Sequence, residues 1–250
     1  MENLQFIDSM LKNKKILITG GSRGLGRALC IACRKQGAEI AFTYSADEEG
    51  ANKTIELCGG AKSYKVSVLD AVGTADMVAD IEKEWGGIDI LINNSGISQN
   101  LPIALTDEED WDAVMDTNIK GMFITSKAIL RTMIRQKNGV ILNMSSLAGS
   151  RMIEAPAHYC TSKAAVNGFT QSLAKEVARY NIRVLALAPG LLNDGIGSNL
   201  PDYRVEDYLK HCSLGRMGTV DEVAEFATFL ISDSNSYMSG NVIVMDGGVL

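Results

Sequence analysis

The sequence predicts an α/β fold: a doubly wound parallel sheet of seven strands between two layers of helices. Short apolar runs of strand length alternate along the chain with longer segments whose apolar residues recur every three or four positions. A glycine-rich turn joins the first of these runs to the first helical segment. This alternation predicts a three-layer α/β/α arrangement, with the strands in the order 3-2-1-4-5-6-7.

Seven segments are expected to form the strands, because each is a short apolar run that ends at glycine or polar residues. They cover residues 14–19, 39–43, 64–69, 89–93, 139–144, 182–188 and 241–245. No internal repeat or low-complexity linker separates them, so residues 1–250 are expected to form a single domain.

Helix ends are marked by capping residues. Gly37 ends the first helix, and the threonine and acids of 106–109 suit the start of a long helical region. Pro156 begins a helix that runs to about Arg179, and a capping-box pattern at 219–222 begins the last helix. Residues 190–215 are rich in Gly, Asn, Asp and Pro around a helical piece at 205–210, and we expect a mobile lid there.

Composition excludes several classes of protein. Lys and Arg number 24 against 30 Asp and Glu, which gives a formal charge of -6 and makes nucleic-acid binding an unlikely function. The first ten residues lack the basic start of a secretory signal, and no apolar run is long enough to span a membrane. A cytoplasmic location is therefore expected.

The five cysteines are an odd number scattered along the chain, which favours free thiols in a reducing compartment. Cys30 and Cys33 have the spacing of a redox pair, but they fall within the first helix, where packing as small apolar residues is the better interpretation. With two histidines and no Cys/His cluster, no catalytic metal is expected.

The glycine-rich turn has the spacing Gly20-x-x-x-Gly24-x-Gly26. Glycine is also needed in tight turns for conformational reasons alone. Between a strand and a helix, however, glycines let the backbone approach a pyrophosphate, whose charge the helix amides then meet. The turn therefore predicts a Rossmann-like dinucleotide-binding fold.

Tyr159 and Lys163 lie four residues apart on the predicted helix, so they share one face. A free phenol has a pKa of about 10, and acid/base work at neutral pH needs a shift of roughly 3 units. A lysine charge about 5 Å away contributes roughly 3 kcal/mol, so we expect Lys163 to supply most of that shift. Ser146 follows the fifth strand, where its hydroxyl can bind a substrate oxygen. A surface tyrosine with a neighbouring lysine is the alternative interpretation of this pair alone.

Taken in order, the glycine turn at 19–26, the Asn-Asn-Ser-Gly segment at 93–96 and the set Ser146, Tyr159 and Lys163 resemble the short-chain dehydrogenase/reductase family. The similarity extends from about Lys14 to Gly248. Within the family, segments 94–97, 107–118 and 214–218 look most like those of 3-oxoacyl-[acyl-carrier-protein] reductases.

The resemblance implies hydride transfer between a nicotinamide cofactor and a carbonyl carbon. Tyr159 is the implied proton donor, Ser146 polarises the carbonyl oxygen, and Lys163 holds the nicotinamide ribose. Asn118 is implied to distort its helix and to maintain a proton path. The implied cofactor-binding residues are Gly20, Ser22, Arg23, Gly24, Leu25, Gly26, Tyr44, Ser45, Asp70, Asn94, Ser95, Gly96, Tyr159, Lys163, Pro189, Gly190 and Leu192.

NADP(H) is the expected cofactor. NAD-specific relatives carry an acid after the second strand, whereas this chain has Tyr44 and Ser45 there. Arg23 could hold a ribose 2′-phosphate, or it could be a solvated turn residue. Asp70 could hold the adenine amino group, cap a helix, or do both. Relatives carry a threonine where this chain has Asn193-Asp194, so a pyrophosphate contact at that place is in doubt.

The expected activity is NADPH-dependent reduction of a β-ketoacyl chain, carried by acyl carrier protein, in fatty-acid or polyketide-like synthesis. Basic residues at the rim would meet the acidic carrier, with Lys137 and Arg179 as candidates and Arg135 and Lys175 nearby; solvated surface cations are the alternative. Dehydrogenation of a free secondary alcohol and a catalytically silent nucleotide-binding scaffold are the alternative functions. The C-terminal segment resembles one that packs on a neighbouring subunit, so a homotetramer is expected.

Overall fold

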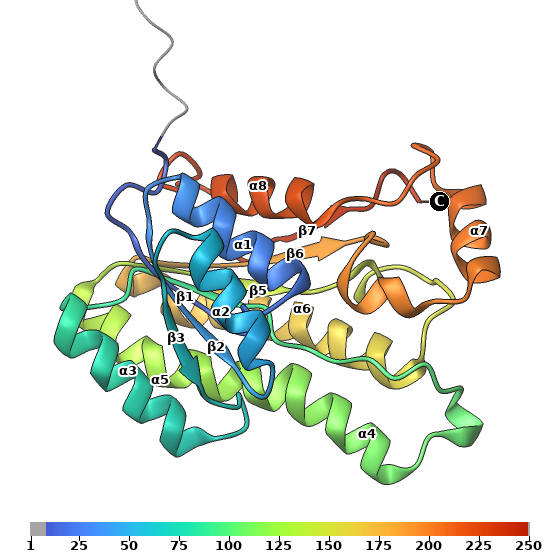
Figure 1. The fold of residues 1–250 in the computed structure, drawn as a ribbon, viewed down its shortest axis with the longest axis horizontal. Coiled ribbons are helices and arrows are strands. Elements are labelled where there is room, and N and C mark those ends of the chain that lie inside the picture. Colours follow the sequence, from blue (N-terminus) through green and yellow to red (C-terminus); the bar gives the residue numbers. More distant parts are fainter. Residues whose placement is uncertain (1–8, 250) are drawn as a thin grey trace, which may run out of the picture.

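The computed structural model describes residues 9–249, except for the side chains of residues 198 and 199. Its centre is one sheet of seven parallel strands in the order β3-β2-β1-β4-β5-β6-β7, which confirms the predicted topology (Figure 1). The strands are β1 Lys15–Ile18, β2 Glu39–Tyr44, β3 Lys62–Lys65, β4 Ile90–Asn93, β5 Gly139–Met144, β6 Ile182–Pro189 and β7 Val242–Met245.

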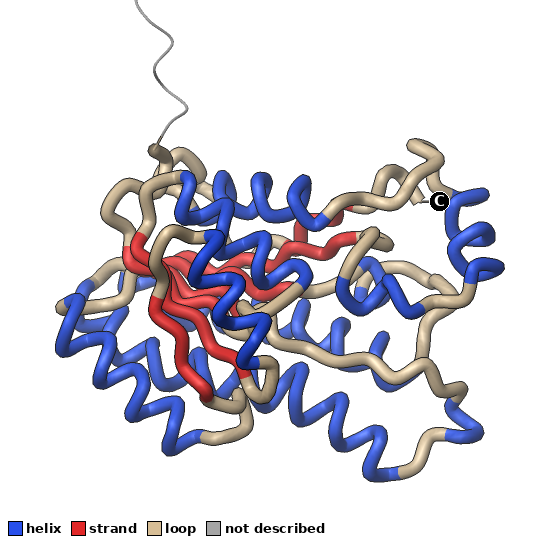
Figure 2. The backbone as a smooth tube through the Cα atoms, viewed as in Figure 1, coloured by secondary structure: helices blue, strands red, loops and turns tan. Residues whose placement is uncertain are grey.

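Helices cover both faces of the sheet, as the colours of Figure 2 make visible. One layer holds α1 Gly24–Lys35, α2 Glu48–Leu57 and α8 Val220–Ile231, and the other holds α3 Ala71–Trp85, α5 Gly121–Gln136 and α6 Ala157–Val177. Two further helices, α4 Glu108–Met115 and α7 Asp202–His211, stand beyond the carboxyl ends of the strands (Figure 1).

Alternate residues of the central strands pack into two separate hydrophobic cores, one on each face of the sheet. In β1, Ile16 and Ile18 pack with α1 and α8, while Leu17 between them packs with the opposite layer. Successive side chains of a strand point to opposite faces, so a strand buried on both sides reads as a continuous apolar run. This is why the central strands were readable from the sequence.

The third strand was predicted in the wrong place. It was expected at 64–69, but β3 covers Lys62–Lys65. Within residues 9–249 its one neighbouring strand is β2, which ends at Tyr44 opposite Lys65, so the residues after Lys65 find no strand to pair with there. They turn instead, with the Asp70 amide donating to the Ser67 carbonyl at 2.9 Å.

Helix starts agree closely with the capping pattern. Thr219 and Glu222 form a capping box at the start of α8, and Asp107 forms one with Asp110 at α4. In the lid, α7 is longer than the predicted helical piece, because it already begins after Pro201.

The cysteines behave as the helix position predicted. All five are free. Cys30 and Cys33 lie on the buried face of α1 and pack into the core. Burial raises the pKa of the Cys33 thiol to about 12, which keeps it protonated and unreactive. No helix within residues 9–249 is long and apolar enough to cross a membrane.

Candidate active site

The candidate site lies at the carboxyl edge of the sheet, where four neighbouring strands end. The glycine turn follows β1, Asn94 follows β4, Ser146 follows β5, and Pro189 ends β6. Ligands of doubly wound folds bind at this edge where the strand order reverses, here between β1 and β4, because the connections after these two strands leave toward opposite sides and open a crevice. Parallel pairing therefore brings together segments that are far apart in the sequence. Thr19 and Pro189, for example, are 170 positions apart.

Tyr159 and Lys163 lie one turn apart on α6. The Lys163 ammonium is 5.7 Å from the centroid of the Tyr159 ring. The Lys163 side chain is buried, and its Nζ donates to the carbonyl of Met144, the last residue of β5, at 2.8 Å. Burial lowers the pKa of Lys163 to about 8. The lysine is thus fixed between the helix and the end of the sheet.

The electrostatics of Tyr159 differ from the expectation. Burial raises the pKa of its phenol above the usual value of 10, and a hydrogen bond with the Ser146 side chain opposes that rise. The expected lowering by Lys163 was wrong for the protein alone. Its ammonium lies 5.7 Å from the ring centroid and donates to the Met144 carbonyl rather than to the phenol oxygen, and burial lowers its own pKa to about 8. The phenol is therefore neutral at pH 7 and suited to donate a proton rather than to take one.

Ser146 is placed beside the phenol by the turn that follows β5. Its Oγ accepts a hydrogen bond from the Ala148 amide at 3.2 Å and lies within hydrogen-bonding reach of Tyr159. Serine and tyrosine hydroxyls therefore converge from different segments, as the sequence predicted.

Asn118 lies in a π-helical turn, Asp116–Lys120, between α4 and α5, which agrees with the distortion implied by the resemblance. The wide turn directs its buried amide at the segment after β4: Oδ1 accepts from the Ile97 amide at 2.8 Å, and Nδ2 donates to the Ile97 carbonyl at 3.0 Å. Nδ2 also donates to Ser162 Oγ on α6 at 2.9 Å. Asn118 therefore joins three segments around the site.

Ser162 is a positioning residue that sequence reasoning missed. It is fully buried, and its hydroxyl donates to the Tyr159 carbonyl at 2.8 Å while it accepts from Asn118. A polar residue three positions after Tyr159, and therefore on the same side of the helix, was the available signal. This contact links the π-helical turn to the helix that carries the phenol.

Buried asparagines brace the centre of the sheet. Asn93 Nδ2 donates to Asn143 Oδ1 at 2.8 Å on the neighbouring strand, and Asn143 Nδ2 donates to Thr170 Oγ1 of α6 at 2.9 Å. Because buried polar groups are costly unless they are paired, this chain of bonds fixes α6 on β5.

The glycine turn is packed against the segment after β4. Thr19 Oγ1 accepts from the amides of Asn94 and Ser95 at 3.0 Å, and Asn94 Nδ2 donates to the carbonyls of Thr19 and Gly20. A Cβ on Gly20, whose φ is +71°, would lie 2.8 Å from Ser95 Oγ, and one on Gly26 would clash with the Gly20 carbonyl. Both positions are therefore restricted to glycine. The turn brings backbone amides to the start of α1 and forms a cradle that fits a dinucleotide pyrophosphate.

The residues predicted to bind the ribose and adenine of the cofactor lie at the same carboxyl edge of the sheet as this turn. Arg23 is exposed at the N-cap of α1, followed by Gly24 at a φ of +51°, while Ser22 is buried and Leu25 partly buried. Tyr44 ends β2 half-buried, and Ser45 after it is exposed. Asp70 caps α3, accepting from the Gly73 amide at 2.9 Å. The helix-cap interpretation of Asp70 is thus confirmed, and its adenine contact stays a prediction.

The turn after β6 is held by α7 and by the C-terminal segment. The Gly190 amide donates to the Met245 carbonyl at 2.9 Å, and Leu192 pairs with Gly218. Asp194 caps the next turn: its Oδ1 accepts from the Gly195 amide at 2.6 Å. Gly195 Cα lies 3.4 Å from the Cβ position of Gly24, so this acid stands beside the glycine turn.

The lid helix α7 is fastened at two points. Arg204 pairs with Glu154 at 3.1 Å and donates to Asn100 Oδ1 at 2.9 Å, which joins the lid to the loops after β5 and β4. The Tyr208 hydroxyl accepts from the Leu191 amide at 3.0 Å and donates to the Asp246 carbonyl at 3.3 Å. These bonds hold α7, the helix of the predicted lid, against the segments after β4, β5 and β6.

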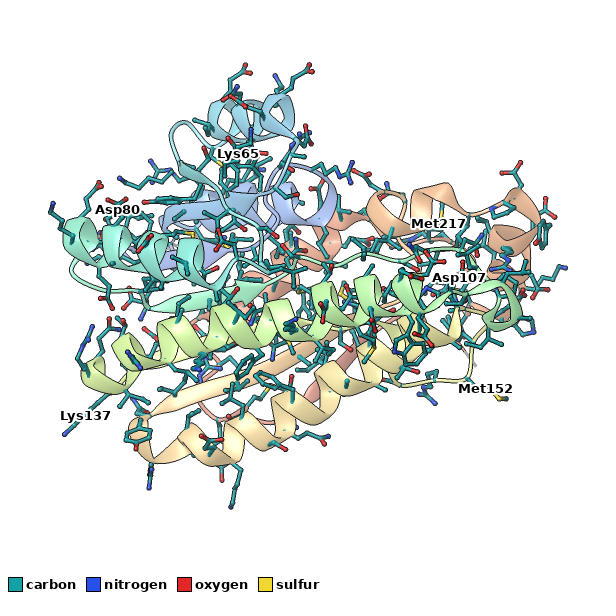
Figure 3. All side chains as sticks on the ribbon, turned by 90° about the horizontal axis from the view of Figure 1, so that it is seen from below. Lys65, Asp80, Asp107, Lys137, Met152 and Met217 are labelled. Atoms are coloured by element: carbon teal, nitrogen blue, oxygen red, sulfur yellow. The ribbon has the colours of Figure 1, made fainter. Side chains whose placement is uncertain are left out.

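The basic residues expected to bind the carrier protein do not lie at the rim of the candidate active site of the same chain. Lys137 ends α5 directly before β5, and Figure 3 shows it at the end of the molecule opposite Met152 and Asp107. Arg179 and Lys175 likewise precede the start of β6. In a doubly wound fold a helix end leads into the amino end of the next strand, so these cations occupy the opposite edge. Arg135 is engaged with Glu82 at 2.9 Å.

Comparisons with known proteins agree with this geometry. Residues 20–250 match the family model described as Enoyl-(Acyl carrier protein) reductase. The chain is 36% identical to 3-oxoacyl-[acyl-carrier-protein] reductase FabG of Chlamydia muridarum, over 97% of this chain and 100% of that protein. It is also 36% identical to the FabG of Thermotoga maritima, over 96% and 99% of the two chains.

Solved structures show the same fold. A 3-oxoacyl-[acyl-carrier protein] reductase from Brucella melitensis superposes with a TM-score of 0.87 at 29% identity, covering 96% of this chain and 92% of that one. The protein gox2181 superposes with a TM-score of 0.90 at 29% identity, covering 95% of each chain. Motifs, fold and relatives agree, and the chain belongs to the short-chain dehydrogenase/reductase family of oxidoreductases.

Proposed function

We propose that this chain is an NADPH-dependent ketoreductase that reduces a β-ketoacyl chain to the β-hydroxyacyl product in fatty-acid or polyketide-like synthesis. The observation that carries the proposal is the neutral phenol of Tyr159 hydrogen-bonded with Ser146 beside a cradle for a dinucleotide. The relatives named 3-oxoacyl-[acyl-carrier-protein] reductase support the choice of substrate.

Reduction of a carbonyl needs a hydride at carbon and a proton at oxygen, and the reduced nicotinamide supplies the hydride when bound. Tyr159 donates the proton, because its phenol is held in the protonated state by burial. The Ser146 hydroxyl donates to the same oxygen and stabilises its developing negative charge. Lys163 orients the nicotinamide ribose, and the Asn118 turn fixes the segment after β4 against α6.

NADPH is the proposed cofactor, held by the residues predicted for it around the glycine turn and the ends of β2, β4 and β6. Arg23 is exposed and next to the turn, and no acid stands at Tyr44-Ser45 to repel a 2′-phosphate. The Arg23→Leu variant should weaken NADPH about tenfold or more, and NADH little, since a charged hydrogen bond contributes about 1.5–3 kcal/mol. Equal weakening of both cofactors would contradict this role.

A carrier-bound substrate, a homotetramer and a cytoplasmic location are part of the same proposal. Light scattering on the purified protein measures the tetramer directly. The position of Lys137 and Arg179 favours a second candidate, a reductase of free ketones, because within one chain no basic patch from this set faces the site.

The deciding experiment compares NADPH oxidation with acetoacetyl-carrier protein, a free β-ketoester, a cyclic ketone and a crotonyl thioester. A preference of at least tenfold in kcat/KM for the acetoacetyl-carrier protein is expected. Equal turnover of the free ketones would favour the second candidate, and turnover of the crotonyl thioester alone would make the chain an enoyl reductase. Loss of oxidation with every carbonyl would leave the silent scaffold as the explanation.

A further inference from the structure

Arg27 lies one turn into α1, outside the residues predicted to bind the cofactor, yet its side chain turns back to the glycine turn. Its Nη2 donates to the Ser22 carbonyl at 2.5 Å and to the Gly50 carbonyl at 3.2 Å, and its Nε donates to Thr54 Oγ1 at 3.1 Å. Thr54 is fully buried on α2, and its hydroxyl donates to the Gly21 carbonyl at 2.9 Å. We call Arg27 and Thr54 the turn clamp.

The turn clamp fixes which way the amides of the turn point. In a trans peptide the carbonyl and the following N–H point in opposite directions. Because the carbonyls of Gly21 and Ser22 face α2, the amides of Ser22 and Arg23 face the other side of the turn. That side is where a pyrophosphate approaches the start of α1.

The clamp also sets the distance between two parts of the proposed NADPH site. Gly50 belongs to the first turn of α2, where its amide is capped by Asp47 at 2.9 Å. This turn begins three residues after Ser45, which follows the end of β2 and is one of the residues proposed to bind NADPH. One guanidinium thus joins the pyrophosphate cradle to the ribose end of the site.

The charge of Arg27 is not neutralised by an ion pair with any residue in 9–249, where the clamp contacts are carbonyl and hydroxyl oxygens. Asp47, Glu49 and Glu56 line the same pocket without an ion pair to Arg27, and the guanidinium offsets part of their negative charge beside the turn where the phosphates bind. We propose that Arg27, supported by Thr54, is a positioning residue that raises affinity for NADPH without touching it. The inference rests on the proposed function, since it takes NADPH as the ligand.

The same helix offers a matched control. Arg34 also donates to two backbone carbonyls, those of Cys58 at 3.2 Å and Ala38 at 3.1 Å, but it does so at the far end of α1. Arg27→Met and Arg34→Met therefore remove similar contacts, and only the first removes them at the turn. Thr54→Val removes the second half of the clamp, while Thr54→Ser keeps its hydroxyl.

The test is a fluorescence titration of NADPH and NADH without substrate, together with hydrogen exchange of the unliganded protein. Arg27→Met should raise the Kd for NADPH about tenfold and that for NADH less, with kcat changed less than Kd. Arg34→Met should leave both Kd values within about twofold. Arg27→Lys and Thr54→Ser should recover part of the loss, and residues 21–24 should exchange faster in Arg27→Met and Thr54→Val.

Unchanged NADPH affinity in Arg27→Met, or an equal loss in Arg34→Met, overturns the inference. If Arg27→Met does not fold, the Thr54→Val and Thr54→Ser pair gives the same comparison. A wild-type protein that binds no NADPH refutes the proposed cofactor instead. In that case faster exchange at 21–24 still supports the clamp, and unchanged exchange overturns it.

Discussion

The helices α6 and α7 border the same site but are held in different ways. α6 is fixed by buried bonds to the sheet and to the π-helical turn, through Lys163, Thr170 and Ser162. α7 has no buried residue, and side-chain bonds from Arg204 and Tyr208 hold it over the edge. The proposed proton donor Tyr159 therefore stands on the firmly held helix, and α7, the predicted lid over the substrate, is the loosely held one. Changes in α6 should affect kcat and changes in α7 should affect KM.

Tyr159→Phe should have the largest effect of any change in α6, because it removes the proposed proton donor and leaves the ring. General acid catalysis contributes about 10²–10⁴-fold, so kcat should fall by that factor. NADPH affinity should stay within about threefold, because the phenol acts on the substrate. Steady-state kinetics and cofactor titration measure both, and a variant with ordinary turnover would refute the assigned role.

The pH dependence of kcat/KM should report the ionisation of Lys163 on α6. Its pKa is lowered to about 8, so its charge is present below pH 8 and is lost as the pH rises through that value. The Tyr159 phenol stays protonated over this range because burial raises its pKa. The kcat/KM for NADPH, which reports the free enzyme, should be level below pH 8 and fall by about tenfold per pH unit above it.

Lys163→Arg should move this falling limb to higher pH, since a guanidinium keeps its charge. A wild-type profile that stays level to pH 9.5 would contradict the role given to the ammonium.

Ser162→Ala tests the link between α6 and the π-helical turn. It leaves Asn118 Nδ2 with the Ile97 carbonyl alone and frees the Tyr159 carbonyl of a bond. Loss of a buried hydrogen bond costs about 1–3 kcal/mol, so the free energy of unfolding in urea should fall by that amount, with a lower kcat. Thr161→Ala, at an exposed neighbour, is the control and should change neither quantity.

Arg204→Met tests the loosely held helix and should have the smallest effect. Partly exposed ion pairs contribute about 0–1 kcal/mol, so loss of the bonds to Glu154 and Asn100 should raise the substrate KM about two- to fivefold. The kcat should stay unchanged. Lys210→Met, which loses a pair with Asp207 inside α7, should leave KM unchanged. A large fall in kcat for Arg204→Met would remove the distinction between the two helices.

Much of the fold could be predicted because its signals lie close together in the chain. β5 was predicted to the residue, since an apolar run buried on both faces needs no distant information. β3 was misplaced because its end depends on where β2 stops pairing. Ser146, Tyr159 and Lys163 were predicted from their spacing together with the family resemblance, and the structure brings them together at one edge of the sheet.

What sequence reasoning missed depends on contacts between distant segments. Arg27 meets Thr54, and Asn118 meets Ile97, across 27 and 21 positions that no periodic pattern connects. The pKa of Tyr159 depends on burial, which a single i,i+4 spacing does not give. The location of Lys137 was predictable, because the direction of parallel strands already assigns the end of α5 to the opposite edge.

The π-helical turn at Asp116–Lys120 has a consequence for how this long helical region tolerates length changes. Such a turn is one extra residue wound into an α-helix. Deleting one residue there should convert the turn to regular α-helix and leave the rotation of α4 relative to α5 nearly unchanged, because the wide turn already absorbs the extra residue. The widened turn that directs Asn118 at Ile97 would then be lost. The extra residue makes this helix less regular, and in return it directs the Asn118 side chain at the segment after β4.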